Sequence, residues 1–488
     1  MNHFQSVRSS ANWLEHWART GPDDTALVIE GVGVFSFGAL ADRVAAMARV
    51  LAEAGVQPGM LVGVEAADQL MHIVALLAGN ALGTCTVSFG AEDVIGGDSL
   101  VGRCDWLLSE ASPQAAVAPG HWLPLDQALI DRLAQCVVTT EDRARLAVPV
   151  DPAALTRITR SSGTTGDKKA FGHSTAQLES QVTVWQAVFG QAGREVAAVC
   201  LYPFPTYVAY HNLIGCMHNG SALCLVSIQN FDRVVAELPA FFVGVVQGQL
   251  PLLLSKYQRG FEHAPTRRLN IIGAEVPAEL WDQLCPIRFG AAHNAYTTSE
   301  MNAFAFGTRG EPYRILPDSA ARIVGEDGAV LPMGRVGLIE IRGPRMTSAY
   351  MWNPELTQKH FVDGWFRTFD LGCMPAPGQL VVAGRGDDVI NIGGIKVMPS
   401  VYETRLRAIA GVRDAVLIGI PDQNQMTQLH VVVEGDGLTM DAALMAAIRQ
   451  AVAGTCDDCW AHAVEKMPRT ETGKVRRGVL RDMFAGSA

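Results

Sequence analysis

Helix patterns alternate with short apolar strand patterns through the first part of the chain. Residues 35–66, FSFGALADRVAAMARVLAEAGVQPGMLVGVEA, predict the end of a strand, an amphipathic helix closed by Gly55, a turn and a second strand. Strand patterns recur at Ser221–Val226 and Phe241–Gln247. Strands separated by helices pair in parallel within one sheet. The alternation therefore predicts α/β layers built on parallel strands.

The pattern changes beyond Gly325. Residues 319–344 predict short strands joined by Asp-Gly and Met-Gly turns, and hence a smaller β-rich unit. The last hundred residues predict a small α+β domain, with helices near 400–409 and 440–452 and strands near 415–420 and 429–434. We place the boundary at Arg385–Asp388, which divides the chain into domains 1–384 and 385–488.

Charge and composition exclude several classes of protein. The 488 residues carry a net charge of −10, which argues against nucleic-acid binding through phosphate contacts. No basic start followed by an apolar run marks a signal peptide. The most apolar stretch, Leu70–Val87, is broken by Asn80 and Gly83, so it predicts a buried helix leading into a strand, not a membrane span.

The ten cysteines are scattered and favour reduced thiols in a cytoplasm. Cys456 and Cys459 form a single C-x-x-C pair, and no second pair lies nearby to make a zinc site.

One loop suits an anion better than it suits a helix or strand. RSSGTTGDKKAFGHS, residues 160–174, combines small hydroxyls, two glycines and two adjacent lysines. Glycine and lysine fit strands poorly, and glycine is unfavourable inside helices. Backbone N–H groups, hydroxyls and ammonium groups together bind phosphate. The loop is not a Walker A motif, because its glycine spacing is wrong, and such a loop alone is often only a flexible linker.

Further motifs follow in order along the chain. They are AYTTSEMN at 295–302, DGWFRTFDLG at 363–372 with a strand that we expect to end at Asp370, GRGDDVINIGGIKV at 384–397, and MPRTETGKVRR at 467–477. Their order and spacing over residues 25–480 resemble the adenylate-forming superfamily of acyl-CoA and aryl-CoA ligases, peptide-synthetase adenylation domains and luciferases. The resemblance implies a large N-terminal domain and a small mobile C-terminal lid with a hinge at 385–388.

The resemblance implies a role for each matched residue. The phosphate loop matches Ser161, Ser162, Gly163, Thr164, Thr165, Gly166, Lys168 and Lys169. The adenine and ribose contacts match Tyr296, Thr297, Asp370 and Arg385, the hinge matches Asp387, the magnesium-associated carboxylate matches Glu300, and the catalytic lysine matches Lys474. The implied reaction uses ATP and Mg²⁺ to convert a carboxylic acid into an acyl-adenylate. Ionised Asp370 suits two ribose hydroxyls, because a carboxylate only accepts hydrogen bonds.

The sequence departs from the family pattern at several of these positions. Lys168 replaces the usual proline, Thr297 replaces a glycine, and Phe369 replaces the glycine before Asp370. Each assignment also has a plainer alternative. Glu300 is then a solvated turn residue, Tyr296 a core aromatic, and Lys474 a surface lysine.

The acid-binding segment resembles that of aryl-acid activating relatives. His211–Asn212 in YPFPTYVAYHNLIG is similar to their His-Asn pair, and the segment has no aspartate to hold an α-ammonium group. An aromatic or compact hydrophobic acid is therefore favoured over an α-amino acid. A hydrogen-bonded core histidine is the alternative for His211. The expected acid pocket comprises Tyr207, His211, Asn212, Gly273, Asn294, Ala295 and Met301.

The acceptor of the acyl group is open among three candidates. NIGGIKVMP, with Gly393, Gly394 and Lys396, resembles the entry for the pantetheine thiol, which favours CoA. A carrier-protein thiol or an amine, as in a stand-alone amide synthetase, is the alternative, and an inactive adenylate-binding protein is a more distant one. The expected partners are small molecules, with neither nucleic acid nor a membrane span, and the sequence is silent on oligomeric state.

Overall fold

The computed structural model places several separate stretches of the chain. It describes residues 9–115, 119–161, 169–189, 196–238, 240–256, 267–273, 275–276, 278–284, 291–392, 395–423, 426–453, 455, 459–469 and 475–485. The side chains of residues 161, 185–187, 189, 256, 278–279, 387 and 395–396 lie outside this description.

A 14-stranded sheet runs through the middle of the molecule and changes character along its width. One part is parallel, as the alternating sequence pattern predicts. It comprises β1 (Thr25–Ile29), β10 (Leu223–Leu225), β9 (Ala197–Cys200), β11 (Phe241–Val246), β12 (Arg267–Ile272) and β13 (Ala291–Thr298). The remainder is antiparallel and includes the β-rich unit expected beyond Gly325. It comprises β2 (Gly33–Ser36), β14 (Asn302–Gly307), β15 (Tyr313–Ile315), β20 (Gln379–Arg385), β19 (Trp365–Cys373), β18 (Phe361–Val362), β17 (Gly337–Arg342) and β16 (Ala320–Val324).

A second sheet has six strands in the order β6-β5-β3-β4-β7-β8. All neighbours are parallel except β7 and β8, which form an antiparallel pair. The strands are β3 (Leu61–Glu65), β4 (Cys85–Ser88), β5 (Trp106–Ser109), β6 (His121–Pro124), β7 (Leu155–Ser161) and β8 (Lys169–Ser174).

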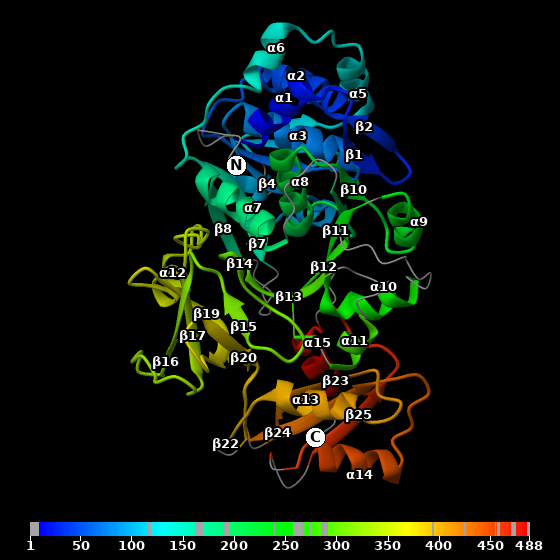
Figure 1. Ribbon diagram of the computed structural model, residues 1–488, viewed down its shortest axis with the longest axis vertical. Coiled ribbons are helices and arrows are strands. Elements are labelled where there is room, and N and C mark those ends of the chain that lie inside the picture. Colours follow the sequence, from blue (N-terminus) through cyan, green and yellow to red (C-terminus); the bar gives the residue numbers. More distant parts are fainter. Residues whose placement is uncertain are drawn as a thin grey trace.

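Helices pack between and around these sheets (Figure 1). They are α1 (Ser10–Thr20), α2 (Phe37–Ala54), α3 (Gln69–Ala81), α4 (Ala91–Ile95), α5 (Gln127–Ala134), α6 (Thr140–Arg145), α7 (Thr175–Phe189), α8 (Tyr207–Asn219), α9 (Phe231–Ala236), α10 (Leu250–Lys256), α11 (Ala278–Gln283) and α12 (Pro354–His360), with short 3₁₀ turns η1 (Val101–Arg103), η3 (Gln247–Gln249) and η4 (Gly386–Asp388). The main hydrophobic core lies among α1, α2, α3 and α8 and includes Trp13, Leu40, Val44, Leu76 and Leu213.

Local sequence accounts for the ends of these elements. Helix α2 ends at Gly55, which adopts φ 104°, a left-handed conformation that glycine accepts without a Cβ clash. The apolar stretch at 70–87 forms α3 followed by β4, as predicted. Strand β19 does not end at Asp370, contrary to our expectation. It continues to Cys373, because residues beyond Asp370 keep partners on both neighbours, with Leu371 opposite Gly384 of β20 and Gly372 opposite Gly337 of β17.

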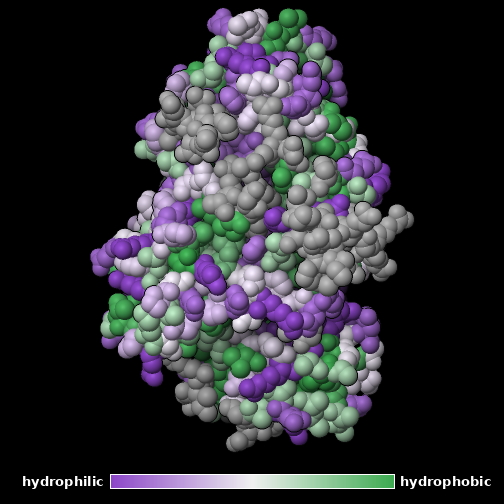
Figure 2. Space-filling model, viewed as in Figure 1, coloured by the Kyte–Doolittle hydropathy of each residue, from purple (hydrophilic) through white to green (hydrophobic). Residues whose placement is uncertain are grey.

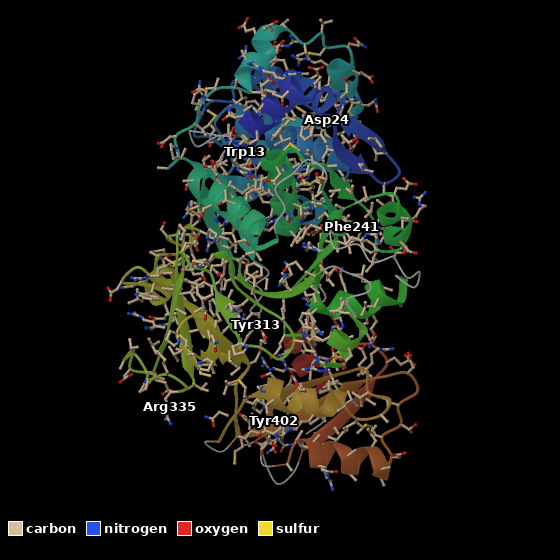
Figure 3. The ribbon with its side chains drawn as sticks, viewed as in Figure 1. Trp13, Asp24, Phe241, Tyr313, Arg335 and Tyr402 are labelled. Carbon is tan, nitrogen blue, oxygen red and sulfur yellow. The ribbon has the colours of Figure 1, made fainter. Side chains whose placement is uncertain are left out.

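The last part of the chain forms a separate body at one end of the molecule, coloured orange to red in Figure 1. It contains β21 (Ile390–Ile392), β22 (Ile395–Val397), α13 (Pro399–Arg407), β23 (Asp414–Pro421), β24 (Thr427–Glu434), α14 (Ala442–Ala451), β25 (Trp460–Val464) and α15 (Arg477–Phe484). Figure 3 labels Tyr402 in this body and Tyr313 in the middle of the molecule. The fold is thus the mixed α/β architecture that the sequence predicts.

The surface is mixed in character. On the face drawn in Figure 2, hydrophobic and hydrophilic residues are interspersed, with no continuous apolar belt. Among the described residues, no helix combines the length and apolar character needed to cross a membrane.

Candidate active site

Strands β7 and β8 hold the two ends of the predicted phosphate loop together. Ser161 at the end of β7 pairs with Lys169 at the start of β8. Ser162, Gly163, Thr164, Thr165, Gly166 and Lys168 lie outside the described residues. Arg160, just before the loop, is anchored by Asp93 at 2.5 Å and by Asp98 at 2.7 Å. Two carboxylates thus fix the strand from which the loop departs.

Strand β13 brings the predicted adenine and ribose residues together. Tyr296 on β13 donates its hydroxyl hydrogen to Oδ2 of Asp370 on β19, over 2.6 Å. Burial, with the adjacent Asp370 charge, raises the pKa of Tyr296 well above its ordinary value, so the phenol stays protonated and keeps donating. Thr297 follows on the same strand. Arg385 ends β20 directly opposite Asp370 in the β19–β20 ladder.

Glu300 lies buried in the turn between β13 and β14, with 6% of its surface exposed. Its Oε1 accepts a hydrogen bond of 2.6 Å from the hydroxyl of Tyr350, and its carbonyl accepts one of 2.8 Å from the Thr347 amide. Burial raises the pKa of the Glu300 carboxyl, while the Tyr350 hydrogen bond and the Lys169 charge oppose that rise. The plainer alternative, a solvated turn residue, disagrees with this burial.

The donor set suits magnesium held partly by a substrate. Magnesium is usually bound by one or two carboxylates, with substrate phosphates and waters completing its octahedron. Glu300 supplies a buried carboxylate, and the Asp370 charge is near enough to raise its pKa. In the part of the chain that the structure describes, no cluster of three or more acidic, histidine or cysteine side chains forms a separate metal cage.

Phe369 contacts both Lys169, at the end of the predicted phosphate loop, and Arg385, a predicted ribose contact. The Nζ atom of Lys169 lies 3.6 Å from the centroid of the Phe369 ring, and Cζ of Arg385 lies 5.3 Å from it. The Tyr350 ring, whose hydroxyl binds Glu300, lies 5.8 Å from the same ammonium group. Four charged residues therefore converge here from separate elements: Lys169 from β8, Glu300 from the turn after β13, Asp370 from β19 and Arg385 from β20.

The expected acid-pocket residues separate into two groups. Tyr207 and His211 lie one turn apart on α8, with ring centroids 6.1 Å apart. The Tyr207 hydroxyl donates to Oε1 of Gln181 over 2.6 Å, and Asn302 donates to the same oxygen over 3.3 Å. Burial lowers the pKa of His211 to about 4, so its imidazole is neutral near pH 7. These hydrogen bonds link Gln181 of α7 and Tyr207 of α8 to Asn302, which begins β14 just after the Glu300 turn.

The second group contains the remaining expected residues, which are Asn212, Asn294, Ala295, Gly273 and Met301. Asn212 donates to the Val208 carbonyl of its own helix over 2.8 Å, and Asn294 donates to the Tyr313 hydroxyl over 2.8 Å. Ala295 is buried on β13, and Gly273 follows β12 with φ 94°. Met301 is fully buried in the hydrophobic cluster with Phe304, Ile339 and Ile341, so the structure places it in the core.

Predicted residues nearer the C-terminus are only partly described. The side chains of Asp387 and Lys396 are outside the description, as are Gly393, Gly394 and Lys474 altogether. The backbone of Asp387 lies in η4, between β20 and β21. Ile392 and Ile395 pair across the residues 393–394.

Several site residues escaped sequence reasoning. Tyr350 has no motif and lies far from Glu300 in the chain. Gln181 lies within helix α7, whose composition gives no sign of a functional residue. Asn302 could have been suspected, because it directly follows the Glu300–Met301 pair, and it adopts φ 63°, a conformation that asparagine tolerates better than most residues.

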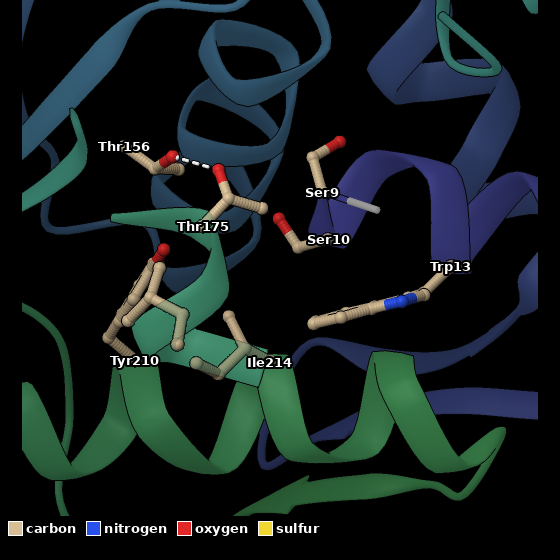
Figure 4. A pocket seen from close by; sticks show the side chains of 8 residues that line it. Ser9, Ser10, Trp13, Thr156, Thr175, Tyr210 and Ile214 are labelled. Atoms are coloured by element: carbon tan, nitrogen blue, oxygen red, sulfur yellow. Dashed lines mark hydrogen bonds between the residues drawn. The ribbon is translucent and has the colours of Figure 1, made fainter. Parts of the chain in front are cut away.

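A small cavity lies away from these residues (Figure 4). It has a volume of about 10 Å³ and is lined by α1 residues, Thr156, Thr175 and Tyr210. Such a volume admits about one water molecule. This cavity is therefore too small to be the substrate site.

Comparison with known proteins identifies the family. A family model described as AMP-binding enzyme matches residues 14–351, which is more than half of the 488 residues. The chain therefore belongs to the AMP-binding enzyme family.

Two relatives and one solved structure align with nearly the whole chain at low identity. Phenyloxazoline synthase MbtB of Mycobacterium sp. (strain MCS) is 26% identical over 96% of this chain, which spans 41% of that longer protein. The 2-succinylbenzoate–CoA ligase of Listeria monocytogenes serotype 4b (strain F2365) is 23% identical, with 96% of this chain and 99% of the ligase aligned. The crystal structure of ATP-bound MatB from Rhodopseudomonas palustris matches with a TM-score of 0.83 at 22% identity, covering 98% of this chain and 99% of MatB. This last similarity shows the fold alone.

Proposed function

We propose that this protein uses ATP to activate a carboxylic acid and then passes the acyl group to the thiol of CoA. The observation that carries the proposal is the convergence of Glu300, Lys169, Asp370 and Arg385 beside the ends of the predicted phosphate loop. Two carboxylates and two cations that meet beside such a loop suit a metal-bound nucleotide. Family membership and relatives named as CoA ligases support the same reaction.

The first half-reaction makes a mixed anhydride. A carboxylate oxygen of the acid attacks the α-phosphorus of ATP, a new P–O bond forms, and pyrophosphate leaves with the electron pair of the broken P–O bond. Negative charge develops on the phosphoryl oxygens, so cations aimed at them lower the barrier. When present, Mg²⁺ held by Glu300 and the phosphates would supply positive charge that neutralises part of this negative charge.

The side chains of this protein have distinct roles in the proposal. The loop Ser161–Lys169 holds the phosphates, Tyr296 stacks on adenine, and Asp370 accepts the ribose hydroxyls. Arg385 makes a second ribose contact, and Lys474 bridges the acid carboxylate and the α-phosphate. The Tyr296 hydroxyl orients the Asp370 carboxylate by binding its Oδ2.

In the second half-reaction the CoA thiol, as thiolate, attacks the acyl carbon, and AMP leaves as the C–O bond breaks. Gly393, Gly394 and Lys396 form the entry for the pantetheine arm in this proposal. Domain 385–488 turns about Asp387 between the two half-reactions. A carrier-protein thiol and an amine are the alternative acceptors, and the experiment below distinguishes them.

The acid is aromatic or compact and hydrophobic in this proposal. Tyr207 and neutral His211 supply aromatic surface one helical turn apart. The YPFPTYVAYHNLIG segment offers no carboxylate to pair with an α-ammonium group. A benzoate-like or heteroaryl acid therefore fits better than an α-amino acid.

The test is ATP–pyrophosphate exchange with a panel of benzoates, heteroaryl acids, fatty acids and α-amino acids, with and without CoA. We expect aryl acids to give the fastest exchange and CoA to be consumed with release of AMP. If α-amino acids give the fastest exchange, the acid assignment is wrong. An amide product with added amines, and no thioester, would assign the acceptor to the amine class. Absence of exchange with every acid, together with tight AMP binding, would leave an adenylate-binding protein.

A further inference from the structure

We propose that Phe369 is a positioning residue of the nucleotide site, which holds the Lys169 ammonium and the Arg385 guanidinium against one aromatic ring. The inference rests on the proposed function, because it assigns both cations to bound ATP. It concerns a residue that stands where the family pattern has glycine, which has no ring to offer.

The contacts around Phe369 place charge on its π-system. Lys169 Nζ lies 3.6 Å from the ring centroid, within the range of a strong cation–π contact, and Arg385 Cζ lies 5.3 Å from it. The imidazole of His360 packs at 4.3 Å between centroids with a tilt of 33°. Phe369 as a whole is only half-buried.

The two cations come from separate strands and carry like charge. Lys169 begins β8 directly after the phosphate loop, and Arg385 ends β20 directly before the predicted hinge. Long side chains such as these sample many rotamers when nothing holds them, so ordering each one costs conformational entropy. The negative face of an aromatic ring attracts both cations and offsets their mutual repulsion.

Each cation also interacts with a carboxylate of the site. Arg385 lies opposite Asp370 in the β19–β20 ladder, and the charge of Lys169 opposes the rise that burial causes in the pKa of Glu300. The ring of Phe369 therefore holds two cations that also interact with the carboxylates of the site. Because these cations are already ordered in the folded protein, their binding to phosphate or ribose oxygens loses less entropy.

The experiment compares Phe369→Gly, Phe369→Leu and Phe369→Tyr with the wild-type full-length protein. We expect Phe369→Gly and Phe369→Leu to raise the KM for ATP about tenfold and to leave the KM for the acid within about twofold. Phe369→Tyr should restore the wild-type KM for ATP, because it keeps the ring. Phe361→Leu is the matched control, since Phe361 packs on Tyr350 and Phe366 and contacts no cation among the described residues.

A second readout does not depend on turnover. Amine labelling of Lys169, followed by peptide mass spectrometry, should be several-fold faster in Phe369→Leu than in the wild type or in Phe361→Leu. Calorimetric titration with ATP and Mg²⁺ should show the same tenfold loss of affinity. A wild-type protein that binds ATP but activates no acid would contradict the proposed function and leave this inference in force. Wild-type-like labelling and ATP affinity in Phe369→Leu, or an equal rise in both KM values, would overturn it.

Discussion

The Tyr350 hydroxyl lies 2.6 Å from Oε1 of Glu300, and both residues are buried. The phenol donates to the carboxylate, which stabilises its ionised form against the cost of burial. Tyr350 is also held in place from both sides, because its backbone bridges to Phe171 of β8 and the following amide of Met351 donates to the Ala170 carbonyl over 2.7 Å. The strand that follows the predicted phosphate loop therefore positions a hydroxyl that favours the ionised form of Glu300 and opposes the rise in its pKa caused by burial.

Removing that hydroxyl should move the pH profile of the enzyme. Tyr350→Phe loses a hydrogen bond to the charged form of Glu300, so the pKa of the carboxyl rises further above its usual value. The acid limb of the exchange rate should shift to higher pH, and the KM for Mg²⁺ should rise by about tenfold, the cost of a hydrogen bond to a charged group. The check is exchange measured from pH 5.5 to 8.5 at several Mg²⁺ concentrations.

Tyr313→Phe is the matched control, because the Tyr313 hydroxyl accepts a hydrogen bond from Asn294, whereas the Tyr350 hydroxyl donates one to a carboxylate. An unmoved acid limb in Tyr350→Phe, or an equal shift in Tyr313→Phe, would contradict the role of the Tyr350–Glu300 hydrogen bond.

The Tyr296–Asp370 pair should show an asymmetric response. Asp370→Asn replaces an acceptor-only group with one that also donates, so we expect the KM for ATP to rise at least tenfold. Tyr296→Phe keeps the ring and frees Oδ2, so it should change the KM for ATP by less than about fivefold. Deoxy analogues of ATP provide the measurement, because Asp370→Asn should discriminate least between ATP and 2′-deoxy-ATP. If Asp370→Asn discriminates between ATP and 2′-deoxy-ATP as strongly as the wild type does, then Asp370 does not contact the ribose.

The sequence predicted the features that depend on local residue patterns and missed those that depend on contacts between distant parts of the chain. Periodicity over a dozen residues located α3 and β4, and the glycine after α2 located its end. The end of β19 was mispredicted because its last three residues owe their conformation to β17 and β20, which lie far away in the chain. Local sequence carries no record of such pairing.

The candidate site follows the same distinction. Glu300 and Asp370 were predicted because their neighbours form motifs, whereas Tyr350 and Gln181 meet predicted site residues only through contacts that the fold creates. The sequence showed that Phe369 departs from the family pattern, but it did not predict the contacts with Lys169 and Arg385. Those contacts form only because the fold brings β8, β19 and β20 together.

Three histidines with lowered pKa values should make the fold sensitive to acid. Burial lowers the pKa of His72 and His173 to about 3 and that of His211 to about 4. In the unfolded chain each titrates near 6.5, so between about pH 4 and 6 the unfolded state binds more protons and stability falls as pH falls. Each contributes a slope of about 1.4 kcal/mol per pH unit. His173→Leu should reduce the slope of unfolding free energy against pH by that amount, as urea titrations at several pH values would measure. An unchanged slope would mean that His173 is protonated in the folded protein.

Arg157 should be more costly to the fold than an apolar residue of similar size. It is 2% exposed, lies over the Tyr210 ring at 4.2 Å, and makes no ion pair among the described residues. Its Nε has no hydrogen-bond partner there. Ser88, which accepts from Arg157 over 2.7 Å, also binds His72, so removing the guanidinium leaves Ser88 satisfied.

We therefore expect Arg157→Met to leave the unfolding free energy unchanged or to raise it by about 1–3 kcal/mol, because replacing an uncompensated buried charge is often stabilising. Arg160→Met is the contrasting control. It removes the cation shared by Asp93 and Asp98 and should cost about 3–5 kcal/mol. Chemical denaturation of the two variants gives the comparison. A large loss of stability in Arg157→Met would mean that an anion pairs with this arginine in the folded protein.

Lys474 lies outside the described residues, but the chain on either side of it is placed. Arg469 and Val475 form a β-bridge, and the amide of Arg476 donates to the Pro468 carbonyl over 2.8 Å, so the two ends of residues 470–474 are held side by side. We expect the ammonium of Lys474 to meet the acid carboxylate and the α-phosphate, where it stabilises charge that develops during adenylate formation. An ammonium shielded from water does this far better than one in water.

Lys474→Ala should therefore slow pyrophosphate exchange by about 10²–10³-fold or more. Transfer from chemically made acyl-adenylate to CoA should be nearly unaffected, because in the proposed cycle domain 385–488 has by then turned about Asp387 and carried Lys474 away from the adenylate. Lys466→Ala is the control on the same segment and should retain exchange. If exchange persists in Lys474→Ala and is lost in Lys466→Ala or Lys396→Ala, the catalytic cation belongs to that other lysine.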